Sequence, residues 1–144
     1  MDRKQLINDL IAEEGCVLHA YADSLGFWTI GVGRLIDKRR GGGITQEEAM
    51  FFLGNDIDKV YAGLKAAFPW FINKPDNVQR ALCDMAFQMG IPGLQKFTTT
   101  LSLIEQGKYK EAAESALKSK WASQTPNRAK RVTSLLTTQG ASNV

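Results

Sequence analysis

The chain has 144 residues, of which 44% are hydrophobic and 23% charged, which is ordinary for one globular domain with a packed core. It contains no run of about 18 apolar residues, so the sequence predicts no membrane span. The two cysteines have neither the spacing of a metal site nor that of a disulfide framework. The first residues lack the pattern of a signal peptide, so we expect the chain to be made in the cytoplasm and to stay there initially.

The net charge of +3 is unevenly distributed. Residues 1–72 hold 8 Lys/Arg and 10 Asp/Glu, whereas residues 73–144 hold 10 and 5. The segment 118–131 carries five basic residues and no acid. Such a run attracts polyanions, either nucleic acid or an anionic cell-wall polymer, and is equally consistent with plain solvated surface.

The first predicted element is a helix that ends at about residue 14. The apolar residues at 6, 7, 10 and 11 have helical spacing, and Glu14 falls near the middle of their face. Gly15 stands where a glycine commonly ends a helix. Partial burial and the negative end of the helix dipole both favour a protonated carboxyl. Glu14 is therefore a candidate general acid.

A β-hairpin is predicted next, because "CVLHAY" and "FWTIGVG" are β-branched and aromatic and are separated by the turn-rich "ADSLG". A third strand is possible through "RLID". Asp23 begins the turn and Thr29 lies on the returning strand, so we expect the two roughly opposite each other with a water between them. Two carboxyls in contrasting surroundings are typical of glycoside hydrolysis. The alternative is that neither carboxyl is catalytic, so that Glu14 merely extends its charged end into solvent and Asp23 merely caps the turn.

Helices are predicted for the rest of the chain. The capping box "TQEE" at 45–48 predicts a helix over 46–67, and the nearly all-round apolar segment 76–89 predicts the buried centre of the second half. Shorter helices are expected at 98–106 and 109–119, and a last one from Pro126 with Thr125 as its N-cap. We therefore expect an α+β fold in one domain. Its parts are a small β-hairpin lobe with the first helix (1–45), a bridging helix (46–67) and an all-helical lobe (68–144).

The motif in the hairpin resembles a known catalytic motif. Glu14, eight residues, Asp23, five residues, Thr29 and then "IGVG" are similar to the motif of the phage-type lysozymes, glycoside hydrolase family twenty-four. The segments "ITQEEA", "FQMG", "GKYKEAA" and "QTPNRAKRV" also resemble that family in the same order, over nearly the whole chain. The resemblance implies a two-lobed lysozyme fold and an inverting endolysin. Glu14 would be its general acid, while Asp23 and Thr29 would position the attacking water. The implied substrate is the β-1,4 bond between N-acetylmuramic acid and N-acetylglucosamine of bacterial peptidoglycan.

The resemblance also implies substrate contacts, although core packing explains Phe87 and Trp121 at least as well. The positions matching the saccharide cleft are Leu35, Phe87, Gln88, Thr100 and Ser115. Those matching the region near the peptide side chain of the wall are Trp121, Gln124 and Arg128. A phage enzyme of this kind is expected to be a monomer without metal or cofactor and without nucleic-acid or membrane partners. It would reach the wall through a phage-encoded membrane pore and lyse the host.

The chain departs from the family pattern at two places. The segment between Arg34 and Ile44 is shorter, and Arg34 stands where the family motif "GxGH" has a histidine. Asp56 falls on the apolar stripe of the helix over 46–67, where a charge needs a partner, so we expect an Arg34–Asp56 ion pair. Two other functions fit parts of the sequence, those of a wall-binding protein without activity and of a small basic nucleic-acid binder. The Glu, Asp and Thr together favour the enzyme.

Overall fold

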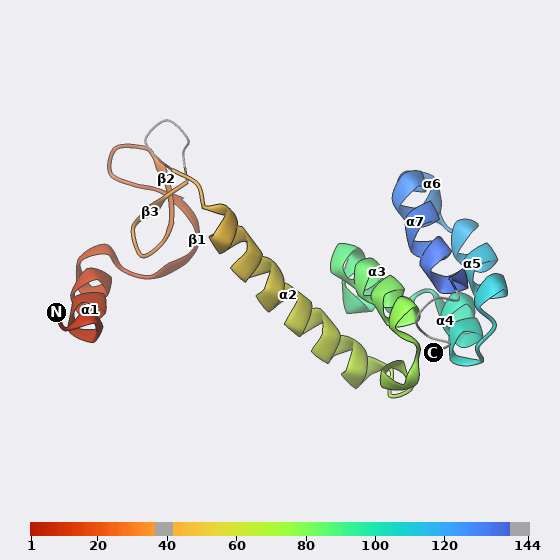
Figure 1. Cartoon of the computed structure of the whole chain (residues 1–144). Helices are drawn as coiled ribbons and strands as arrows, with labels where there is room; N and C mark the ends of the chain where they lie inside the picture. The colour runs from red at the N-terminus through yellow and green to blue at the C-terminus, as the bar shows by residue number, and fades with distance from the viewer. Residues whose placement is uncertain (37–41, 139–144) are drawn as a thin grey trace. The chain divides into compact units, whose positions relative to one another are not determined.

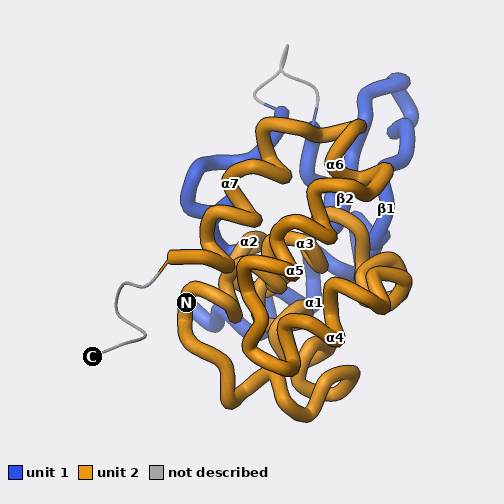
Figure 2. The backbone as a smooth tube through the Cα atoms, turned by 90° about the vertical axis from the view of Figure 1, so that its right-hand side faces the viewer, with its two compact units in different colours: residues 1–51 blue, residues 52–144 orange. Residues whose placement is uncertain are grey.

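The computed structural model describes residues 1–36 and 42–138 (Figure 1). The chain divides into two compact units, residues 1–51 and residues 52–144, which Figure 2 colours separately. In the part of the chain that the structure describes, strands are confined to the first unit and most of the helices belong to the second, so the expected α+β class is confirmed. Among the residues described, no helix is both long enough and apolar enough to cross a membrane.

The first unit opens with helix α1 (Arg3–Glu14), which leads into a three-stranded antiparallel sheet. The Asp2 carboxylate caps the start of α1 by accepting from the Gln5 N–H at 3.0 Å. Gly15 ends the helix with φ of 75°, as the sequence predicts, and its N–H donates to the Ile11 carbonyl. The strands are β1 (Val17–Ala22), β2 (Trp28–Gly31) and the two-residue β3 (Arg34–Leu35), in the order β1-β2-β3. The hairpin and the third strand are thus confirmed.

The register of the hairpin corrects one expectation. Tyr21, not Asp23, lies opposite Thr29, and the turn is closed by the Asp23 N–H donating to the Phe27 carbonyl at 2.8 Å. Asp23 is two residues beyond Tyr21, so it faces the same side of the sheet as Thr29 but as a diagonal neighbour. The turn is therefore centred one residue earlier in the chain than an Asp23–Thr29 pairing requires.

Helix α2 (Gln46–Ala67) begins where the capping box predicts. The Glu48 N–H donates to Thr45 Oγ1 at 3.1 Å, and the Thr45 N–H donates to Glu48 Oε1 at 2.8 Å. Both ends of the box are therefore satisfied, which fixes the first turn of α2.

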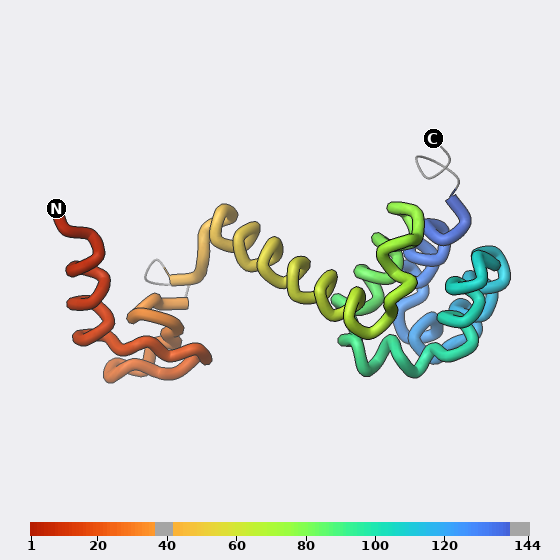
Figure 3. The backbone as a smooth tube through the Cα atoms, turned by 90° about the horizontal axis from the view of Figure 1, so that it is seen from below, coloured from red at the N-terminus to blue at the C-terminus, as the bar shows by residue number. Residues whose placement is uncertain are grey.

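The second unit contains the apolar core. After the short 3₁₀ helix η2 (Phe71–Asn73), helix α3 (Asp76–Gln95) passes through its middle. The expected burial of this segment is confirmed, because Val78, Ala81, Leu82 and Met85 are at most 1% exposed. Gly90, with φ of 77°, breaks α3 into two parts. Helices α4 (Thr98–Glu105), α5 (Tyr109–Leu117), α6 (Lys120–Gln124) and α7 (Pro126–Thr137) follow, and α7 packs on both α3 and α5 (Figure 3).

Two features around α6 differ from expectation. The helix predicted over 109–119 ends at Leu117, and Ser119 caps the separate helix α6 by accepting from the Ala122 N–H. Thr125 does occupy the N-cap position of α7, but its side chain makes no capping hydrogen bond. Its Oγ1 instead donates to the Trp121 carbonyl at 2.9 Å, which ties α7 to the end of α6.

Candidate active site

Asp23 is held at the β1–β2 turn by backbone donors. Its Oδ1 accepts from the Leu25 N–H at 2.9 Å and from the Phe27 N–H at 2.8 Å. Such a side chain-to-backbone pattern is what makes aspartate a turn residue. Because Oδ1 carries both of these bonds, the described residues leave the other carboxylate oxygen to accept a proton or a water.

Thr29 is anchored to the same residue. It is 3% exposed, and its Oγ1 donates to the Phe27 carbonyl at 3.1 Å. With its proton so engaged, the hydroxyl presents a lone pair that can accept from a water. The backbone of Phe27 thus binds both Asp23 and Thr29, which fixes the two side chains relative to each other.

Glu14 is the last residue of α1, and its side chain lies over Gly33 in the turn between β2 and β3. Within its own unit Glu14 is exposed, and no residue of α1 is buried, so the partial burial expected from its apolar face is not observed there. The remaining described residues of the first unit give its carboxyl no hydrogen bond or ion pair. Because Glu14 is exposed, its carboxyl is accessible to a substrate oxygen.

Leu35, a predicted saccharide contact, lies in β3 directly opposite Thr29. It is half-buried, so part of the side chain remains accessible beside the Thr29 strand.

Arg34 forms an ion pair, but not with the expected partner. Its Nη1 and Nη2 donate to the two carboxylate oxygens of Glu48 at 2.7 and 2.9 Å, and its Nε donates to the Gly43 carbonyl at 3.0 Å. The expected Arg34–Asp56 pair is therefore wrong. The capping box already directs the Glu48 carboxylate back toward residue 45, whereas Asp56 lies more than two turns further along α2 and is exposed.

The capping box and Arg34 together lower the pKa of Glu48 from 4.5 to about 2, with the Thr45 N–H as the largest cause and Arg34 next. Since the folded pKa is depressed, the stabilisation is present above pH 4.5 and is lost as the pH falls through about 2. We therefore expect the wild type to have a higher melting temperature than Glu48→Gln at pH 6. This gap in melting temperature should close between pH 4.5 and 2.

Thermal melts by circular dichroism at several pH values measure this gap. Glu47→Gln is the matched control, because Glu47 is also an acid in the first turn of α2. A gap for Glu48→Gln that stays constant from pH 6 to 2 would contradict the pairing of this carboxylate.

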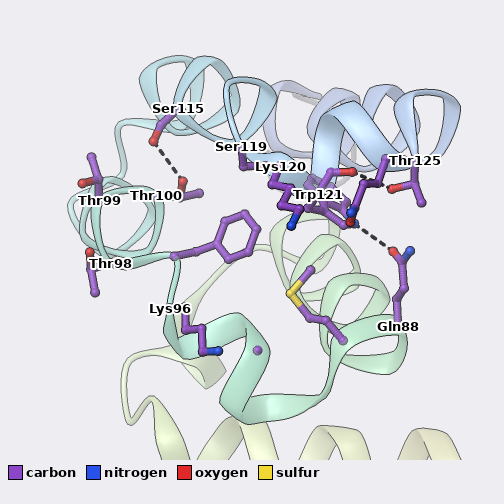
Figure 4. A pocket seen from close by; sticks show the side chains of 14 residues that line it. Gln88, Lys96, Thr98, Thr99, Thr100, Ser115, Ser119, Lys120, Trp121 and Thr125 are labelled. Carbon is purple, nitrogen blue, oxygen red and sulfur yellow. Dashed lines mark hydrogen bonds between the residues drawn. The ribbon is translucent and has the colours of Figure 1, made fainter.

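The second unit contains a pocket of about 580 Å³ (Figure 4). Five of the predicted substrate-binding residues line it: Gln88, Thr100, Ser115, Trp121 and Gln124. Trp121 Nε1 donates to Gln88 Oε1 at 2.8 Å, and Thr100 Oγ1 donates to Ser115 Oγ at 3.0 Å. These bonds orient the polar lining from four different helices. A lining of apolar side chains with a few well-placed polar groups is typical of ligand pockets.

Sequence reasoning missed other residues of this pocket. Lys96 follows α3 and Lys120 begins α6, and both bring positive charge to the lining. Thr98, Thr99 and Ser119 add hydroxyl groups. The basic run over 118–131 pointed to Lys120 as part of a polyanion-binding surface, but nothing local to Lys96 distinguishes it from a solvated lysine.

Three residues of the second unit that were predicted to contact substrate either have a structural role or lie outside this pocket. Trp121 is 9% exposed and meets the Phe97 ring edge-on with centroids 6.0 Å apart, so it packs in the core as well as lining the pocket. Phe87 is 45% exposed on α3 and does not line the pocket. Arg128 Nε donates to Asp84 Oδ1 at 2.8 Å, which fastens α7 to α3.

Several known proteins are similar to this chain over most of its length. The family model described as phage lysozyme matches residues 12–139. The probable T4-type lysozyme 1 of Dictyostelium discoideum is 30% identical, over 92% of this chain and 94% of the relative. The endolysin of Acyrthosiphon pisum secondary endosymbiont phage 1 is 33% identical, over 73% and 70%. The pre-baseplate central spike protein Gp5 of Enterobacteria phage T4 is 32% identical over 88% of this chain, which spans 26% of the spike protein.

Proposed function

Because the chain belongs to the phage lysozyme family and is therefore a glycoside hydrolase, we propose that it cleaves bacterial peptidoglycan. The bond is the β-1,4 linkage between N-acetylmuramic acid and N-acetylglucosamine. The observation that best supports this reaction is the anchoring of Asp23 and Thr29 on the backbone of Phe27. A carboxylate and a hydroxyl fixed in this way can hold one water in a defined position.

In the proposed reaction Glu14 is the general acid. It gives its proton to the glycosidic oxygen as the bond from that oxygen to the anomeric carbon breaks. The water held by Asp23 and Thr29 attacks the anomeric carbon from the opposite face, and Asp23 takes the proton that this water loses. The new hydroxyl group therefore has the inverted configuration. This geometry requires carboxyl groups about 6.5–9.5 Å apart, so that a water fits between the second carboxylate and the sugar.

The pocket of the second unit would bind saccharide and peptide groups of the same polymer. Its amide and hydroxyl side chains (Gln88, Thr100, Ser115, Gln124) suit the hydroxyl and N-acetyl groups of a saccharide. Lys96 and Lys120 suit the carboxylates of the wall's peptide side chains. Leu35 and Phe87 are further proposed saccharide contacts. Arg128 is a proposed contact for the peptide region through the part of its guanidinium that Asp84 leaves free.

The biological role that fits this activity is host lysis by a phage endolysin. The protein would act as a monomer, remain in the host cytoplasm and pass to the wall through a phage-encoded membrane pore. The endolysin among its relatives supports this role. The basic residues over 118–131 would then face an anionic wall polymer rather than nucleic acid.

Purified sacculi from a Gram-negative bacterium test the proposal. We expect the wild type to clear the suspension and to release reducing sugar, and we expect no retention of DNA on a gel at physiological salt. Binding to sacculi without release of reducing sugar would indicate a wall-binding protein that lacks activity. Retention of DNA without clearing would indicate a nucleic-acid binder. Either result would contradict the proposed function.

A further inference from the structure

The Glu14 carboxyl lies so close to Gly33 that a side chain at residue 33 would occupy the same space. An ideal Cβ built on Gly33 would be 2.6 Å from Glu14 Oε2, 2.8 Å from Cδ and 3.0 Å from Cγ. These separations are shorter than van der Waals contact between such atoms. The missing Cβ of Gly33 thus makes room for the Glu14 carboxyl.

Other glycines of the hairpin are different. Gly26 and Gly31 also have positive φ, at 85° and 70°, but a Cβ at either position would meet nothing within 4 Å. Their backbone conformation alone accounts for glycine there. Gly33 has φ of 65° and in addition contacts Glu14. The contact therefore gives this position a role beyond that of a turn residue.

We propose that Gly33 is a positioning residue for Glu14. Because Gly33 has no Cβ, the Glu14 carboxyl can lie against its Cα, and this contact sets the position of the carboxyl. The proposal rests on the proposed role of Glu14 as general acid. The close approach of the carboxyl to the Gly33 Cα is the contact within this unit on which the proposal is built. A Cβ at residue 33 would push the flexible end of Glu14 aside without displacing the backbone of α1.

Displacing a catalytic group by about 1 Å can cost about 10²-fold in rate. We therefore expect Gly33→Ala to lower kcat on solubilised glycan strands by about 10- to 100-fold and to leave KM nearly unchanged. Gly31→Ala is the matched control, because it places an alanine at nearly the same φ with no neighbour to meet. It should lose comparable thermal stability but retain kcat close to that of the wild type.

If Gly33→Ala does not fold, Gly33→Asn and Gly31→Asn repeat the comparison, because asparagine tolerates positive φ. Asparagine also places a Cβ at residue 33, so we expect the same loss of kcat relative to its Gly31→Asn control.

The outcomes separate this proposal from the proposed function. Equal kcat for Gly33→Ala and Gly31→Ala, with Glu14→Gln inactive, would overturn the positioning role and leave the acid role intact. An active Glu14→Gln would overturn the acid role and this proposal with it.

Discussion

Glu14→Gln is expected to lose essentially all hydrolysis of peptidoglycan while melting at the temperature of the wild type. The amide has the shape of the carboxyl but cannot give a proton to the leaving oxygen, and loss of general acid catalysis costs about 10²–10⁴ in rate. The fold should not suffer, because Glu14 is exposed in its unit and holds no described partner there. Initial rates of reducing-sugar release and thermal melts measure the two effects.

Glu13→Gln is the matched control for this prediction. Glu13 precedes Glu14 on the last turn of α1, is also exposed and is the same residue type, so its amide variant should hydrolyse at the wild-type rate. A Glu14→Gln variant that keeps more than about a tenth of the wild-type rate would be inconsistent with general acid catalysis at this residue.

Asp23→Asn should also reduce kcat by about 10²–10⁴. The asparagine oxygen can accept the two N–H groups of Leu25 and Phe27 as Oδ1 does now, so the turn should persist. The other position would then carry an NH₂ group, which donates hydrogen bonds and cannot take a proton from water. Initial rates should fall while the melting temperature stays near that of the wild type.

Asp23→Ala separates the two tasks of this side chain. Alanine removes both the base and the acceptor for the turn, so we expect a loss of rate together with a loss of stability. If Asp23→Asn hydrolysed peptidoglycan as fast as the wild type, Asp23 would serve the turn alone and the proposed base would have to be sought elsewhere.

Features set by local chemistry could be predicted from the sequence. Gly15 ends α1 because a glycine accepts positive φ, and Thr45 and Glu48 start α2 because they satisfy each other's backbone N–H groups. The burial of α3 followed from its nearly continuous apolar pattern. Each of these signals lies within a few residues of the structure it specifies.

Features set by contacts between distant residues could not be predicted in this way. Helix α6 has five residues, which is too short for a periodic pattern. The Thr125 hydroxyl donates to the Trp121 carbonyl and accepts from no N–H group of α7. From the sequence alone, Arg34 could pair with more than one acid of α2, including Asp56 and Glu48. The capping box holds the Glu48 carboxylate near residue 45, and Arg34 pairs with it. Lys96 and Lys120 line one pocket from elements far apart in the chain.

Inversion of the configuration of N-acetylmuramic acid through Glu14, Asp23 and Thr29 is the step on which the proposed function of this lysozyme most depends. An NMR time course of the anomeric protons during hydrolysis of solubilised glycan strands tests it most directly. We predict that the first new signal belongs to the α-anomer of a reducing N-acetylmuramic acid, with the β-anomer growing later by mutarotation. A first signal from the β-anomer, from reducing N-acetylglucosamine or from an anhydro sugar would contradict the proposed reaction.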